Sequence, residues 1–424
     1  MVGAIADRND LDGAALLDLV QERTLLYFWD FAHPASGLAR ERSNRFAGYG
    51  PEVVTTGGSG FGVMALIVGS ERQWLGRAAV LDRLLQATGF LQEADRYHGI
   101  FPHFLDGATG RTIPFSRMDD GGDLVETSYL LAGLLCARQY FDRDHPGEAE
   151  LRARIDSLWQ EAEWSWHTRG GRNVLYWHWS PNHGWSMNLE IRGWNECLLT
   201  YVLAASSPHH AIDAEVYHDG WAQGPNFRNG REFYGMTLPL GPDYGGPLFF
   251  AHYSFLGLDP RGLKDRYADY WLQNVNHTLI NREHCIRNPH GFKGYGADCW
   301  GLTSSDDHLG YHRHEPDRDL GVIAPTAALA SFPYTPEHSM RALRHFCYDL
   351  GDRIWGEYGF ADAFSETHDW YASSHLAIDQ GPIVAMIENY RTGLLWQLLM
   401  SCEEIQAGLR RLGFESPHLQ PALG

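Results

Sequence analysis

The sequence predicts an all-α protein: one (α/α)6 barrel, or toroid, of about twelve helices that spans residues 1–424 as a single domain, with long active-site loops at one end. Three observations predict this fold. Apolar residues recur at helical spacing in twelve segments, the segments are interpreted as two kinds that strictly alternate along the chain, and long connections lead into one kind. Strand patterns are few, and short hairpins are expected only around 97–113 and 172–187.

The first kind of helix is amphipathic. In one example, Leu151, Ile155, Leu158 and Trp159 fall on a single helical face. A helix with one apolar and one charged side lies at the surface of a core. Such helices are expected at 11–32, 72–94, 151–166, 264–281, 336–350 and 394–412.

The second kind of helix is apolar nearly all round and follows a polar, Gly-rich loop. A helix that is apolar on every side is buried on every side. Six buried helices enclosed by six amphipathic ones form an (α/α)6 barrel, and no polar linker divides the chain. The apolar helices are expected at 57–69, 123–141, 188–205, 248–257, 320–331 and 382–391.

The long connections each precede an apolar helix, so all of them should gather at the end of the barrel where the inner helices begin. Long loops without regular structure in a compact domain are usually functional. The active site is therefore predicted at this mouth. The connections are 33–56, 95–122, 167–187, 206–247, 282–319 and 351–381.

Charge and composition restrict the partners. The chain has 34 basic and 53 acidic residues, a formal net charge of −19. This balance disfavours nucleic acid, anionic membrane and uronic-acid polymers as partners, because each requires a basic surface. Aromatic residues make up 13% of the chain, with 15 Trp. They suit either a large core or stacking on the rings of a neutral sugar.

The expected compartment follows from weaker signals. Residues 1–10 lack the basic and then apolar pattern of a secretory signal, and no apolar run is long enough to cross a membrane. The six cysteines form no CxxC pair, and three lie in apolar helical runs, so six reduced thiols are expected. These features predict a cytoplasmic protein, or a periplasmic one if a leader has been removed.

Acidic residues concentrate at the predicted mouth. Asp119, Asp123 and Glu126 lie around one helix start, and the last two share a helix face because they are three residues apart. Asp123 is a candidate for catalysis or a simple N-cap. Glu126 is harder to explain structurally, because a carboxylate inside an apolar helix is costly unless it is paired or used.

Two further acids complete the candidate set. Glu196 adjoins an apolar run, and partial burial there would raise its pKa and suit a general acid; its alternative is an ion pair with Arg192. Asp362 lies in a loop among aromatic residues and is the candidate base, or else a turn residue. Asp379 is interpreted as a helix cap.

No known metal or cofactor motif is present. The chain contains no HExxH, no paired CxxC, no phosphate-binding Gly-loop-Lys and no GxSxG. No cofactor or catalytic metal is therefore expected, and a structural metal has no support from sequence motifs.

Several long motifs resemble the glucoamylase-like domain of glycoside hydrolase family 144, which has a relative in cyclic β-1,2-glucan synthases. The resemblance covers roughly residues 15–412. Mild departures, such as Trp194 where Tyr is more usual, leave the acids intact but put the substrate preference in doubt. The motifs are GGDLVETSYLLAGLL, WNECLLTYVLAASSP, GGPLFFAHYSFLGLDP, GYGADCWGLTSSD, APTAALASFPYTPE, YGFADAFSE and AIDQGPIVAMIENYRTGLLW.

The resemblance implies an (α/α)6 barrel that hydrolyses β-1,2-glucan or sophoro-oligosaccharides, usually with inversion. It implies that the acid acts through a substrate hydroxyl. Two alternatives stay open: a β-1,2-glucan transglycosylase on the same site, and a non-catalytic glucan-binding barrel. The essential acids that the resemblance implies are Asp119, Asp123, Glu126, Glu196 and Asp362.

Candidate sugar-binding residues lie in the mouth loops and in one inner helix. Each loop Trp can stack on a glucose ring or pack its own loop. His252 and Tyr253 are candidates to face the cleft, although a buried, satisfied histidine is nearly as common. A cytoplasmic enzyme would meet short sophoro-oligosaccharides rather than polymer. The Trp candidates are Trp177, Trp179, Trp185, Trp300 and Trp370.

Overall fold

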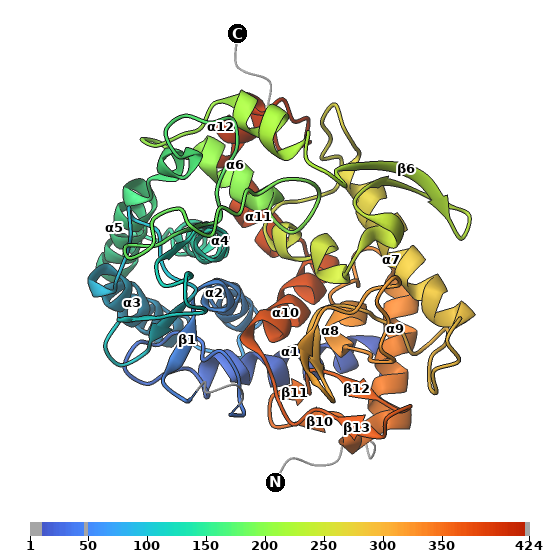
Figure 1. Ribbon diagram of the computed structural model, residues 1–424. Coiled ribbons are helices and arrows are strands. Elements are labelled where there is room, and N and C mark those ends of the chain that lie inside the picture. Colours follow the sequence, from blue (N-terminus) through green and yellow to red (C-terminus); the bar gives the residue numbers. More distant parts are fainter. Residues whose placement is uncertain (1–10, 46–49, 420–424) are drawn as a thin grey trace.

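The computed structural model describes residues 11–45 and 50–419, and its helices form a ring (Figure 1). The N-terminal residues 1–10, on which the expectation about a signal rests, lie outside the described residues. The α-helices are α1 (Gly13–Trp29), α2 (Thr56–Glu71), α3 (Arg77–Glu93), α4 (Leu124–Tyr140), α5 (Pro146–Glu161), α6 (Leu198–Ser206), α7 (Tyr270–Arg287), α8 (Pro325–Leu329), α9 (Pro336–Arg344), α10 (Ala377–Arg391), α11 (Leu394–Met400) and α12 (Glu403–Arg411).

The inner ring consists of α2, α4, α6, a pair of 3-10 turns, α8 and α10. The two turns, η5 (Leu248–Ala251) and η6 (Tyr253–Leu256), replace the helix predicted at 248–257. Helix α2 contacts α4 and α10, α4 contacts α6, and α10 contacts α8. Helices α1, α3, α5, α7 and α9 lie outside this ring (Figure 1). The predicted α/α toroid is confirmed.

One position in the outer ring is filled from the far end of the chain. Two apolar segments follow each other around 206–247, where a π-helical turn, η3 (Val216–Trp221), a hairpin and a 3-10 turn, η4 (Asp243–Gly245), intervene in place of an outer α-helix. Helix α12 packs against α6 instead and covers it from outside (Figure 1). The predicted helix 394–412 is therefore wrong as a single element: Cys402 is extended (φ −66°, ψ 121°) and separates α11 from α12.

Other predicted helices are shorter or shifted. The segment 188–205 is helical only from Leu198, because Gly193 has a φ of +78° that a helix excludes. Helix α7 begins later than predicted because Asp269 caps it, accepting from the Leu272 N–H at 3.1 Å. The segment 336–350 ends in a π-helical turn, η7 (His345–Leu350).

The strands are short, and most lie in the mouth loops. The hairpin predicted at 97–113 is present as β2 and β3, to which β1 adds a third antiparallel strand. The one predicted at 172–187 is wrong, because β5 pairs with β4 instead. The strands are β1 (Val53–Thr55), β2 (Phe104–Asp106), β3 (Thr112–Ile113), β4 (Gly122–Asp123), β5 (His178–Trp179), β6 (Arg228–Phe233), β7 (Met236–Leu240), β8 (Ser305–Asp307), β9 (Gly310–His312), β10 (Trp355–Gly356), β11 (Gly359–Phe360), β12 (Phe364–Ser365) and β13 (Trp370–Tyr371).

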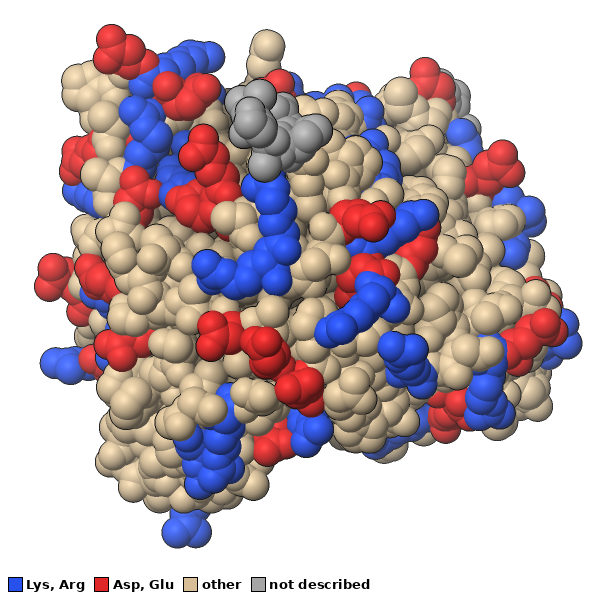
Figure 2. Space-filling view, turned by 90° about the horizontal axis from the view of Figure 1, so that it is seen from above, with Lys and Arg blue, Asp and Glu red and all other residues tan. Residues whose placement is uncertain are grey.

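The charged side chains on the surface and the state of the cysteines agree with the composition. On the face shown in Figure 2, acidic and basic side chains are interspersed among uncharged ones. All six cysteines are free and buried, as their apolar settings predict. Among the described residues, no helix combines the length and the hydropathy that a membrane span needs.

Two glycines let α2 and α4 approach backbone to backbone. A Cβ atom on Gly60 would lie 2.1 Å from the carbonyl oxygen of Tyr129, and one on Gly133 would lie 2.2 Å from the carbonyl oxygen of Gly60. Neither contact can relax by moving a flexible side chain. The spacing of the two inner helices that deliver Glu126 to the mouth therefore depends on these glycines.

We expect Gly60→Ala and Gly133→Ala each to lower the free energy of unfolding by about 1–3 kcal/mol, because the added methyl group forces the helices apart. Urea unfolding followed by circular dichroism measures this. Gly296→Ala is the matched control, since nothing lies within 4 Å of its Cβ position. Equal stabilities for all three variants would show that the crossing tolerates expansion.

Candidate active site

A cavity of about 410 Å³ opens where the inner helices begin. Its wall combines aromatic and aliphatic side chains with three carboxylates, contributed by Glu41, Glu126 and Glu196. Such a mixture is typical of a small-molecule site. The remaining lining residues are Arg42, Thr55, His103, Phe104, Phe115, Val125, Tyr129, Trp177, Phe249, Tyr253, Ser304, Tyr311, Leu376 and Ile378.

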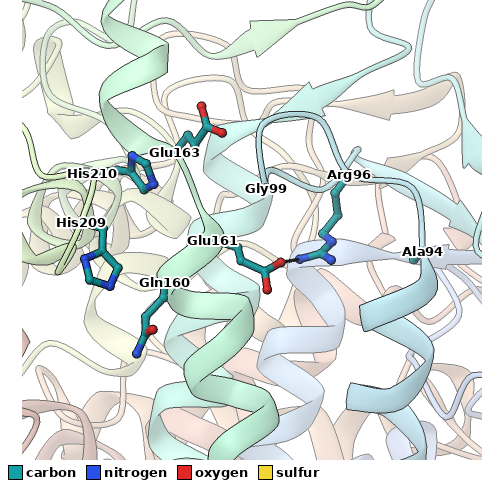
Figure 3. Close-up of a pocket in the computed structure, with 8 residues that line it drawn as sticks. All are labelled: Ala94, Arg96, Gly99, Gln160, Glu161, Glu163, His209 and His210. Carbon is teal, nitrogen blue, oxygen red and sulfur yellow. Dashed lines mark hydrogen bonds and ion pairs between the residues drawn. The ribbon is translucent and has the colours of Figure 1, made fainter.

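A second hollow, of about 670 Å³, lies at the outer surface between the ends of α3 and α5 (Figure 3). An ion pair between Arg96 and Glu161, with an N–O distance of 2.7 Å, crosses it. It holds none of the predicted acids and no large apolar ring: its lining is Ala94, Arg96, Gly99, Gln160, Glu161, Glu163, His209 and His210. The smaller cavity at the mouth is therefore the candidate active site.

Asp123 is both a helix cap and the centre of a charged cluster, so both predicted roles apply. Its Oδ1 accepts from the N–H groups of Val125 and Glu126, each at 3.0 Å, and from Trp177 Nε1 at 3.0 Å. Its Oδ2 accepts from His103 Nδ1 at 3.0 Å. Burial opposes ionisation, but His103 and His178 outweigh it and hold the pKa of Asp123 well below its usual range.

Two histidines balance the carboxylates of this wall. His178 Nε2 lies 3.1 Å from Asp119 and 3.5 Å from Asp123. Burial disfavours its charged form, but the two carboxylates prevail and raise the pKa of His178 to about 10. In the same way, Glu126 and Asp123 overcome burial and raise the pKa of His103 to about 9. Both imidazoles are therefore cationic at neutral pH.

Glu126 lies in the first turn of α4, above this cluster. Its Oε2 accepts from the Gly57 N–H at 2.8 Å, and its Oε1 lies 4.0 Å from His103 Nε2. Burial raises the pKa of Glu126. A backbone donor of α2 and a cationic histidine are therefore the partners that this buried acid was expected to need.

Glu196 faces the cavity from the turn that precedes α6. Its side chain is half-buried, and the surrounding protein raises its pKa to about 7 by desolvation. The alternative ion pair does not form, because Arg192 pairs with Glu190 at 3.1 Å. Glu196 can therefore hold a proton at neutral pH and release it, as a general acid must.

Asp362 lies behind the cavity wall rather than in it. It is buried, and its Oδ2 accepts from the Asp306 N–H at 2.6 Å. Burial and the neighbouring carboxyls of Asp379 and Asp306 raise the pKa of Asp362 well above the usual range. Asp306 is itself held by Arg42, with N–O distances of 3.1 and 3.3 Å.

Asp379 belongs to the same group, and its interpretation as a cap is wrong. Leu376 is the N-cap of α10, and Asp379 lies buried in the first helical turn. Burial raises its pKa to about 7, against hydrogen bonds from Asp362 and from the hydroxyl of Tyr253, which lines the cavity. Asp362 and Asp379 thus form a carboxyl pair that holds a proton into the neutral range.

Some of the predicted sugar-binding residues line the cavity, and others lie elsewhere in the structure. Trp177 and Tyr253 line the cavity. His252 is buried, with Nε2 2.9 Å from Ser331 Oγ, so it does not face the cleft. Trp300 is fully buried in the core, where neither ring face is free.

The three remaining tryptophans lie outside the cavity wall. Trp179 contacts the rings of Tyr97, His98 and Trp166. Trp185 contacts the rings of Trp166, His167 and Tyr176. Trp370, on β13, packs against a small core cluster that contains Val322, Ala324 and Ala363. All three are half-buried and serve loop packing in this structure.

Two exposed aromatic residues of the cavity wall were not predicted from the sequence. Phe115 is 49% exposed and Tyr311 is 42% exposed, although both line the cavity. Phe115 lies against His103, with ring centroids 4.3 Å apart. Such exposed rings at a cavity are suited to contact with a sugar face. Glu41 and Arg42 also reach the cavity, from a loop that carries no motif.

Comparisons with known proteins identify the relatives of this chain. The model of a family described as "Putative glucoamylase" matches residues 188–403. An exo β-1,2-glucooligosaccharide sophorohydrolase (non-reducing end) of Parabacteroides distasonis is 46% identical over 418 residues, which are 94% of this chain. The chain spans 57% of the length of that relative.

Solved structures are similar over the whole toroid. An endo-β-1,2-glucanase from Chitinophaga pinensis, in complex with sophorotriose and glucose, is 56% identical with a TM-score of 0.94, covering 96% of this chain and 100% of that one. A "putative glucoamylase" from Bacteroides uniformis is 58% identical with a TM-score of 0.95, covering 97% and 100%.

We expect His178→Asn to lower the free energy of unfolding by about 3 kcal/mol or more below pH 6.5, because Asp119 and Asp123 lose a cationic partner. The folded pKa of about 10 exceeds the unfolded value of 6.5, so this stabilisation is complete below pH 6.5. It disappears as the pH rises through about 10, and the difference between variant and wild type should shrink accordingly.

Urea unfolding across this pH range measures the difference. His209→Asn, an exposed histidine of the outer hollow, is the control and should show no such trend. A pH-independent difference for His178→Asn would mean that His178 acts by packing alone.

Proposed function

Because the chain belongs to the glucoamylase-like family of glycoside hydrolases, family 144, we propose that it hydrolyses β-1,2-glucan or sophoro-oligosaccharides with inversion at the anomeric carbon. The names of two relatives support the substrate: one is a β-1,2-glucooligosaccharide sophorohydrolase and the other an endo-β-1,2-glucanase. A neutral glucan suits a chain of net charge −19.

One observation carries the reaction type. Glu196, with a pKa of about 7, faces an aromatic cavity, while a proton-holding carboxyl pair lies behind another part of the wall. Glu196 precedes α6, and Asp379 lies at the start of α10. These inner helices are three positions apart in a ring of six, so the two acid groups come from opposite sides. Glycoside hydrolysis needs such a pair of carboxyl groups on either side of the bond.

The roles follow from the protonation states. Glu196 donates its proton toward the glycosidic oxygen as the bond to the anomeric carbon breaks. The pair of Asp362 and Asp379 takes up a proton from the water that attacks the opposite face of that carbon. Tyr253 joins the pair to the cavity, because its hydroxyl contacts Asp379 and its side chain lines the wall. Glu196 returns to its starting state by taking a proton from solvent, and the pair of Asp362 and Asp379 releases to solvent the proton that it gained.

The charged wall around Asp123 positions the substrate. His103, cationic and half-exposed, lines the cavity and can donate to a sugar hydroxyl. Glu126 beside it can accept from one. Trp177 keeps its Nε1 on Asp123 and presents its ring to the cavity. Asp119, through His178, keeps this wall rigid.

We expect Glu196→Gln to lower kcat/KM on linear β-1,2-glucan by about 10²–10⁴-fold, because the variant cannot donate a proton. In the wild type, kcat/KM should fall as the pH rises above about 7, where Glu196 loses its proton, and the variant should lack this limb. Reducing-end release measures the rate.

Glu190→Gln is the control for this variant: Glu190 is six residues away and outside the cavity wall, and its loss should leave the rate near wild type. Proton NMR of the first product should show the α-anomer if the enzyme inverts, and longer oligosaccharides would indicate transglycosylation instead. A Glu196→Gln enzyme with wild-type rate would refute the assignment.

We expect Phe115→Ala to raise KM for β-1,2-gluco-oligosaccharides by roughly 2- to 12-fold with little change in kcat, since a ring contact contributes about 0.5–1.5 kcal/mol. Steady-state kinetics measure this. Trp166→Ala is the control: Trp166 is also exposed, at 39%, but lies outside the cavity wall. Equal changes in KM for both variants would argue against a sugar contact at Phe115.

A further inference from the structure

A second group of chemically reactive side chains lies away from the cavity. It comprises Cys299, His345 and Glu366, whose sulfur, nitrogen and carboxylate oxygen atoms all lie within 4.8 Å of one another. The three come from the loop after α7, the first residue of η7 and the turn between β12 and β13. None of them lines the candidate active site. Figure 1 shows α9, β12 and β13 together at one edge of the toroid.

His345 is oriented as metal-binding histidines are. Its Nδ1 donates to the carboxylate of Asp349 at 2.7 Å, which leaves Nε2 as the nitrogen with a free lone pair. This Nε2 is buried and has no hydrogen-bond partner among the described residues. Histidines that bind metal usually donate their other N–H to a carboxylate in this way, which fixes the ring and its tautomer. A buried acceptor without a donor is costly unless another group fills the place.

Cys299 and Glu366 present the other two donors. The thiol is buried, and burial together with the nearby carboxylates of Glu366 and Asp298 raises the pKa of Cys299. The carboxylate of Glu366 is seated against the loop at Gly294, where a Cβ atom would lie 2.2 Å from Oε1. Gly294 has a φ of +88°, so any other residue there would be strained and would also displace Glu366. The carboxylates of Glu366 and of Asp349, which accepts from His345, bring negative charge to the site and favour a cation.

We propose that Cys299, His345 and Glu366 bind one zinc ion, with a water molecule as the fourth ligand. Zinc takes this donor set in tetrahedral geometry, whereas Ca²⁺ and Mg²⁺ require oxygen ligands. Bond lengths of about 2.0–2.3 Å separate tetrahedral ligand atoms by roughly 3.3–3.7 Å, so small side-chain rotations close the site. The thiol proton is released to solvent as the Zn–S bond forms.

The ion would brace the mouth of the toroid. Glu366 lies four residues after Asp362, and β12 lies between them. Fixing Glu366 to the end of α9 and to the loop at Cys299 therefore restrains the segment that carries Asp362. This role is structural, and it stands whether or not the proposed hydrolase activity is correct.

The test is titration of the full-length, tag-free protein with Co²⁺ and Zn²⁺ after removal of metals with a chelator. We expect one Co²⁺ per chain, with a thiolate-to-cobalt charge-transfer band in the near ultraviolet, and displacement of Co²⁺ by Zn²⁺. Zinc should also raise the Tm. Cys299→Ala and His345→Gln should abolish the band, and Cys347→Ala should keep it. Cys347 is the matched control, because it is also buried and lies two residues from His345.

A surface variant keeps the test decisive if the buried ones fail to fold. Asp349 is 70% exposed, and Asp349→Asn should weaken zinc binding by about 10–100-fold through the orientation of His345 alone. Absence of binding to the wild type would overturn the proposal. So would binding without a sulfur band, because that would place the ion elsewhere, as at His103, Asp119 and Asp123, which include no thiol.

Discussion

The mouth of the toroid depends on one buried carboxylate, Asp123. It ends β4, caps α4 through the N–H groups of Val125 and Glu126, holds Trp177 and binds the ring of His103. A fully buried carboxylate is tolerable only when donors surround it, and here four donors do. The start of an inner helix, a cavity ring and a cationic imidazole are thereby fixed relative to one another. Loss of any one donor would affect all of them.

The opposite wall follows a different charge balance. Arg42 is the cation that holds Asp306. The neighbouring Asp362 and Asp379 show no such ion pair among the described residues. Like charges held in a buried place cannot all ionise, so the pair retains a proton. Glu196 retains one for another reason, which is desolvation. The charges around Asp123 are thus fixed, whereas Glu196 and the pair of Asp362 and Asp379 carry exchangeable protons. Acid and base catalysis requires groups of the second kind.

The sequence is sufficient for the toroid and for the neighbourhood of the acids, because helical periodicity and burial act locally. The sequence is insufficient where a segment far away in the chain determines the local structure. Gly193 delays the start of a predicted helix through its own φ, but the outer helix missing from 206–247 is replaced from the C-terminus, which no local pattern indicates. Trp300 looked like a loop aromatic and is core, since the loop folds over it. Arg42 and Asp306 meet across 264 residues of sequence, so their roles become visible only in three dimensions.

Three acids occupy the same structural position, and yet their chemistry differs. Glu126 and Asp379 lie in the first turn of α4 and α10, and Glu196 lies just before α6. A helix N-terminus stabilises an ionised carboxylate by about 0.3–1 kcal/mol and would lower each pKa. The pKa of each of the three acids is nevertheless raised, and burial is the largest cause in every case. Asp123, at the same end of α4, is ionised because cationic histidines donate to it. The toroid therefore supplies equivalent positions, and the loops that bring or withhold donors decide which acids keep a proton.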